Sequence, residues 1–204
     1  MKISFEVWAQ LFLADEDCER ICSFLKDEAG IKKKFLLKRL HMTVYHARRP
    51  MRNLLNCIEP INIVVPAVDT RFMVMAPGGE NPQPNIDPGH RKLGIRILWQ
   101  SLAMPAIQIL RHRLIDYESP MVLGNRPRST ARTSAFGARS FQAHLGLIRA
   151  GSGIDRDLTL LGAPFRAKVG DLRFDRFLIE TVCLTSEGGS APDSAKHTKH
   201  ASDT

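Results

Sequence analysis

A segment rich in proline and glycine divides this chain. The stretch "PGGENPQPNIDPGH", residues 77–90, contains four prolines and three glycines. Proline removes a backbone donor and glycine favours turns, so neither a helix nor a central strand is expected to pass through it. It also lacks the Gly-Lys-Ser/Thr ending of a phosphate-binding loop. The 204 residues must therefore build their core from the segments on either side, as one domain or as two small, closely packed lobes.

Alternating polar and apolar residues predict strands on both sides of this loop. The expected strands cover 3–13, 35–47, 61–68, 70–76, 92–98, 140–150 and 173–184. Helices are expected over about 16–28, which Asp15 can cap and Gly30 can end, and over a short stretch at 51–58. A further helix follows Ser101, because Ile107, Leu110 and Leu114 recur at helical spacing.

The order strand, helix, histidine-bearing strand thus occurs twice, which predicts a duplicated unit. We expect an α+β fold of two lobes, about 1–76 and 91–186, in which two antiparallel or mixed sheets face a central groove and the helices lie outside. The composition of 187–204 predicts a disordered tail.

Composition limits the classes of partner. The formal charge of +8 and 44% hydrophobic content predict a globular protein that binds an acidic partner, most commonly a nucleic acid or nucleotide. The four cysteines lack paired metal-ligand spacing, so we expect them to be reduced and structural. Neither a membrane span nor a signal peptide is recognisable, and we expect a cytoplasmic monomer.

Two of the predicted strands carry a histidine in a comparable setting. In "RLHMTVYHAR", strict alternation would place His41, Thr43 and Tyr45 on one face, and in "FQAHLGLIR" it would align His144 with Gly146. Two imidazoles held against one substrate suit cleavage of a phosphodiester, because one can accept a proton from the attacking oxygen while the other donates to the leaving oxygen. No metal or other cofactor is required for this chemistry. A histidine on a half-buried strand is more often structural, so the pairing carries the hypothesis.

With these motifs the chain, over about residues 3–184, resembles the two-histidine (2H) phosphoesterases, which include the RNA 2′,3′-cyclic phosphodiesterases also called 2′-5′ RNA ligase-like proteins. The resemblance implies metal-independent hydrolysis of a 2′,3′-cyclic phosphate or of a 2′-5′ linked or cyclic oligonucleotide, with an RNA end or small nucleotide as substrate. It also implies that His41 donates a proton, that Thr43 binds phosphate and that His144 is the base on water.

One position departs from the family pattern. Gly146 stands where the second motif has Thr or Ser, so no hydroxyl is available there for the phosphate. Arginines of the preceding loop, Arg132 and above all Arg139, are candidates to replace that contact, and Tyr45 is a candidate to stack on a base. Alternatively, the chain is a nucleotide- or RNA-binding module that does not cut its ligand, or an interaction domain that has lost both functions.

Two arginines inside predicted strands, Arg71 and Arg96, also need an anionic partner if they are buried or face a groove. The sequence alone does not rank them against the arginines of the loop.

Overall fold

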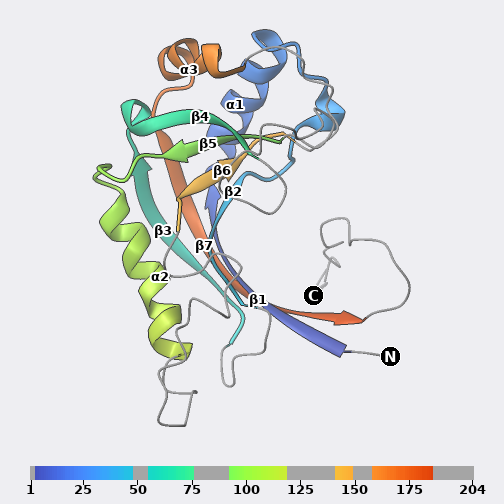
Figure 1. The fold of residues 1–204 in the computed structure, drawn as a ribbon, viewed down its shortest axis with the longest axis vertical. Coiled ribbons are helices and arrows are strands. Elements are labelled where there is room, and N and C mark those ends of the chain that lie inside the picture. The colour runs from blue at the N-terminus through green and yellow to red at the C-terminus, as the bar shows by residue number, and fades with distance from the viewer. Residues whose placement is uncertain (1–2, 48–54, 76–91, 119–140, 149–157, 186–204) are drawn as a thin grey trace, which may run out of the picture.

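The computed structural model describes residues 3–47, 55–75, 92–118, 141–148 and 158–185, which form three α-helices and two antiparallel β-sheets (Figure 1). The α+β class expected from the sequence is confirmed. The helices are α1 (Asp15–Asp27), α2 (Met104–Glu118) and α3 (Gly162–Lys168). The strands are β1 (Ile3–Leu13), β2 (His41–Ala47), β3 (Cys57–Val65), β4 (Thr70–Met75), β5 (Lys92–Ile97), β6 (His144–Gly146) and β7 (Leu172–Thr185).

The larger sheet has the strand order β2-β1-β7-β3, and the smaller one has the order β4-β5-β6. The sheets therefore do not coincide with the two predicted lobes. Strand β7, from the C-terminal part of the chain, pairs with both β1 and β3 in the larger sheet, while β4 joins β5 in the smaller one. Figure 1 shows β1 and β7 running side by side through the molecule.

The core lies between the sheets and the helices. Strand β1 alternates as its sequence requires, so Val7, Ala9 and Leu11 are fully buried while Trp8 and Gln10 on the other face are only half-buried. Helices α1 and α3 meet through an edge-to-face contact of Phe24 with Phe165, whose ring also meets Phe72 of β4 edge to face. These aromatic contacts join α1, α3 and the smaller sheet.

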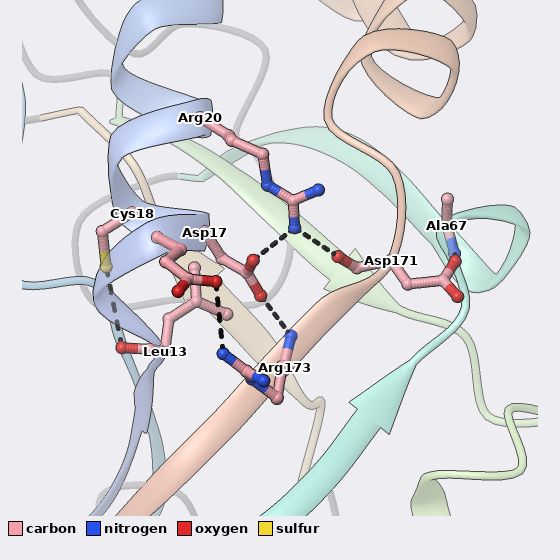
Figure 2. Close-up of polar contacts among 8 residues, drawn as sticks. Leu13, Asp17, Cys18, Arg20, Ala67, Asp171 and Arg173 are labelled. Atoms are coloured by element: carbon pink, nitrogen blue, oxygen red, sulfur yellow. Dashed lines mark hydrogen bonds and ion pairs between the residues drawn. The ribbon is translucent and has the colours of Figure 1, made fainter.

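A buried carboxylate fixes the start of α1 to the start of β7. Asp17 is 3% exposed and accepts hydrogen bonds from the backbone N–H of Arg173 and from the guanidinium of Arg20. The same guanidinium donates to the carbonyl oxygen of Asp171, at 3.1 Å (Figure 2). Because a buried carboxylate must be paired, this cluster holds the helix in one position on the sheet.

Several local predictions differ from the structure. The helix expected over 51–58 is wrong at its end, where Cys57 and Ile58 belong to β3. Helix α1 begins at Asp15 itself, and no side chain caps it. Gly30 does end the segment, with a φ of 64°. The four cysteines, all among the described residues, form no disulfide, and Cys183 is exposed.

None of the helices in the described part of the chain is both long and apolar enough to cross a membrane.

Candidate functional site

The two histidine strands, far apart in sequence, lie side by side in the structure, since β2 of the larger sheet contacts β6 of the smaller one (Figure 1). The chain just before β2 is bonded to the chain just after β6. Leu36 and Ile148 form an antiparallel bridge, and the N–H of Leu37 donates to the carbonyl oxygen of Leu147 at 3.2 Å. The junction of the sheets is thus built around the two predicted histidines, His41 and His144.

Each histidine ring is held by a backbone group two residues before it. The Nδ1 of His144 lies 2.8 Å from the carbonyl oxygen of Gln142, and His41 is hydrogen-bonded to the backbone of Arg39. Because a carbonyl only accepts, Nδ1 of His144 carries a proton, and in the neutral ring Nε2 is the basic nitrogen. Such an orienting bond is what a catalytic imidazole needs.

The electrostatics of the two rings are linked. Burial lowers the pKa of His41 below its ordinary value of 6.5, the hydrogen bond to Arg39 opposes this shift, and the charge of His144 lowers the pKa further. The charge of His144 therefore acts on His41 in the same direction as burial does. Burial therefore favours the neutral form of the His41 ring.

The phosphate ligand implied by the resemblance, Thr43, lies on the face of His41, since Thr43 pairs with Gln10 and His41 with Phe12 on the adjacent strand. Thr43 is 9% exposed. Its surface toward a ligand is therefore small, and its role as a phosphate ligand stays a prediction.

A β-bulge changes the expected position of Tyr45. The register between β1 and β2 shifts between Ala9 and Gln10, so Ala9 pairs with Tyr45 while Gln10 pairs with Thr43, and Val44 is the extra residue. Because an extra residue reverses the alternation, Tyr45 lies on the core face, with 2% exposure. The expectation that Tyr45 shares the face of His41 is wrong, and its buried ring leaves no surface on which a base could stack.

The same bulge places His46 on the face of His41. The ring of His46 stacks on Trp8, and the ring of His41 lies 5.7 Å, between centroids, from that of Phe12. Trp8 and Phe12 are four residues apart on the regular strand β1 and share one face. Phe12 is therefore the aromatic side chain beside His41, whereas Trp8 lies on the same face about 13 Å further along β1.

In the smaller sheet, His144 is in register with two arginines. Arg96 of β5 lies directly opposite His144 of β6, and Arg71 of β4 lies directly opposite Arg96. Both arginines are exposed, whereas Ile95 and Leu145, on the other face of the sheet, are buried. The sequence indicated that these arginines need an anionic partner if they face a groove. Their alignment with His144 could not be predicted, because it depends on strand pairing, which no local pattern encodes.

Other candidates fall away from this junction or outside the described residues. Arg132 and Arg139 lie in the range 119–140, which the structure does not describe. A cavity of about 890 Å³ is lined by α1, by Lys168 and by Asp171 and Arg173, and neither histidine contributes to it. Within the described ranges, no group of three or more His, Cys, Asp or Glu side chains comes together as a metal site.

No protein-family model and no curated protein sequence matches this chain.

Proposed function

We propose that this protein is a metal-independent phosphodiesterase that hydrolyses a nucleotide 2′,3′-cyclic phosphate or a 2′-5′ linked or cyclic oligonucleotide. The observation that carries the proposal is the contact between β2 and β6, which brings together His41 and His144 from distant parts of the chain. The interaction of their charges and the positive charge of the whole chain, +8, support a site for a phosphate ester.

In the proposed reaction with a cyclic phosphate, water attacks phosphorus and one ring P–O bond breaks. The neutral imidazole takes a proton from the water, and the protonated imidazole gives its proton to the leaving sugar oxygen. The product is a phosphomonoester with a free neighbouring hydroxyl. Burial lowers the pKa of His41, which favours the neutral ring that a base needs, whereas the resemblance implies that His41 is the proton donor.

The test is hydrolysis of 2′,3′-cyclic mononucleotides, 2′-5′ linked dinucleotides and cyclic dinucleotides in the presence of EDTA, by the wild type, His41→Ala and His144→Ala. General acid–base catalysis contributes about 10²- to 10⁴-fold, so each substitution should reduce kcat by at least that lower factor. The double variant should be little worse than either single one, because the two rings act as a unit. The matched control is His112→Ala, an exposed histidine on α2, which should keep full activity. Cutting that survives both site substitutions would overturn the proposal.

A second function is favoured by one observation. Gly146 offers no hydroxyl, and Thr43, which would supply the other, is 9% exposed, so the site is poor in phosphate ligands of the kind the family uses. A nucleotide- or RNA-binding module with the same fold would bind its ligand with a salt-dependent affinity and cut none of the panel. Binding without turnover in the same assay would favour this alternative.

A further inference from the structure

Three side chains in neighbouring strands of the smaller sheet form one row, Arg71, Arg96 and His144. Residues directly opposite in an antiparallel pair have Cβ atoms about 5 Å apart, and strands are about 4.8 Å apart. Arg96 is therefore one strand away from His144, and Arg71 is about 10 Å from it. Since β6 also contacts β2, His144 is the end of the row at the histidine pair, and Arg71 is the end farthest from it.

Two guanidinium groups directly opposite each other repel one another unless an anion lies between them. Other arginines of this protein are neutralised by carboxylates, as Arg113 is by Glu59 and Arg176 by Asp15 and Asp175. Arg71 and Arg96 form no such pair with any residue that the structure describes, including Asp69, two residues before Arg71 in the chain.

The next row of the same face lacks side chains. Two residues along from Arg96 and His144, Gly94 lies directly opposite Gly146. Neither strand therefore offers a hydroxyl beside His144, and the cation nearest to it in the sheet register is Arg96. A guanidinium forms charge-assisted, often bidentate hydrogen bonds with phosphate oxygens, so it can make the contact that Gly146 cannot.

We propose that Arg96 binds the phosphate held at the histidine pair and that Arg71 binds a second phosphate of the same ligand. This assignment rests on the proposed function, because it assumes that the first phosphate is the one hydrolysed at the histidine pair. It also narrows the class of substrate. The substrate carries at least one phosphate besides the one that is cut, as an oligonucleotide or a terminally phosphorylated nucleotide does, and a mononucleotide with a single cyclic phosphate is a poor substrate.

The probes end in phosphomonoesters, which a phosphodiesterase does not hydrolyse. Binding is therefore measured apart from turnover. We would measure the affinity of adenosine 2′-monophosphate and of adenosine 2′,5′-bisphosphate by calorimetry. A third probe, a 3′-5′ linked dinucleotide with a 2′-phosphate end and no 5′-phosphate, lacks the linkages that the proposed enzyme cuts and distinguishes an internal second phosphate from a terminal one. The variants are Arg71→Gln and Arg96→Gln, and Lys26→Gln on α1 is the control with the same loss of charge.

The wild type should bind at least one two-phosphate probe tenfold or more tightly than the monophosphate. Arg71→Gln should lose about tenfold in affinity for that probe only, whereas Arg96→Gln should lose about tenfold for all probes. The slope of log affinity against log salt for that probe should fall by about 0.7 to 0.9 for each lost phosphate contact. Lys26→Gln should bind as the wild type does.

Equal losses for all probes with Arg71→Gln, or no loss, would overturn the second subsite, and so would the absence of binding by any probe. Arg71→Lys keeps the positive charge but loses the planar guanidinium, so it should bind the two-phosphate probe with intermediate affinity. This variant replaces Arg71→Gln in the test if Arg71→Gln fails to fold. If the probe-selective loss is found and the wild type cuts neither the phosphodiester panel nor a 5′-phosphorylated 2′,3′-cyclic nucleotide, the subsite stands and the proposed hydrolase activity fails.

Discussion

The imidazole of His46 stacks on the indole of Trp8, with ring centroids 3.8 Å apart and an interplanar angle of 18°. This contact fixes the pairing of β1 with β2 beyond the bulge at Val44, because a slip of one residue would move His46 to the other face. The stack therefore holds the register in which His46 lies on the same face as His41 and Thr43.

Replacing Trp8 with alanine should destabilise the protein by about 2 to 3 kcal/mol, since it removes a half-buried aromatic ring and its stacking. Trp8→Phe keeps a ring for His46 and should lose less than about 1.5 kcal/mol. Urea unfolding of both variants measures the difference. Equal losses of unfolding free energy in the two variants would mean that the stacking of an aromatic ring on His46 does not stabilise this end of the strands.

The carboxylate of Asp17 should be far more important for stability than its neighbour Glu16. Asp17→Asn removes the charged acceptor, itself buried, of a partly buried backbone N–H and of a half-exposed guanidinium, which should cost about 2 to 4 kcal/mol. Glu16 has a side chain that is 83% exposed and meets Arg173 at 3.4 Å, so Glu16→Gln should change stability by less than about 0.5 kcal/mol. Thermal and urea unfolding of the pair provide the comparison, and similar losses would contradict the assigned role of Asp17.

Strands with strict alternation were predictable. The pattern of residues 3–13 matches β1 at both ends, because a strand with one buried face must alternate. Short apolar runs were not predictable, since the end of the expected helix at 51–58 turned out to be the start of β3 and such runs do not distinguish the two structures. Helix α3 was missed because Gly162 and Pro164 are typical of a turn, although proline is also compatible with the first turn of a helix.

The site was predictable only in part, for a physical reason. The two histidines could be identified because each stands in an alternating segment. The faces of Tyr45 and His46 could not, because Val44 is an ordinary strand residue and nothing in the sequence marks it as the extra residue of a bulge. The alignment of Arg96 with His144 depends on which strands pair, and that is decided by packing across the whole fold.

The lowered pKa of His41 predicts a dependence of stability on pH. In the unfolded chain His41 titrates near its ordinary value, about 6.5, and in the folded protein its pKa is lower. Between these values the unfolded state binds more protons, so the free energy of unfolding rises with pH there. Acidification from pH 7.5 through the folded pKa should therefore destabilise the wild type, and His41→Gln should lose less stability over the same range.

Urea unfolding at pH 7.5, 6.5 and 5.5 measures this effect. His112→Gln, a change at an exposed histidine of α2, should keep the pH dependence of the wild type. The same slope in His41→Gln and in the wild type would show that His41 is not the group responsible.

Restoring the missing hydroxyl tests whether Arg96 has taken its place. Among the described glycines, positive φ angles occur at Gly30 and Gly170, so the backbone of Gly146 is compatible with a side chain. If Arg96 makes the phosphate contact, Gly146→Ser should raise kcat/KM by less than about threefold in the wild type, where the contact is already made. In the Arg96→Gln background it should raise kcat/KM about tenfold, because a charge-assisted hydrogen bond is regained.

The comparison is a double-mutant cycle, which isolates the coupling of two neighbouring positions. Gly146→Ala in both backgrounds is the control, since it adds a Cβ without a hydroxyl and should not rescue Arg96→Gln. An equal gain from Gly146→Ser in the two backgrounds would mean that the guanidinium and the hydroxyl act independently. In that case Arg96 would not replace the second hydroxyl of the motif, and the phosphate contact at β6 would have to come from another group.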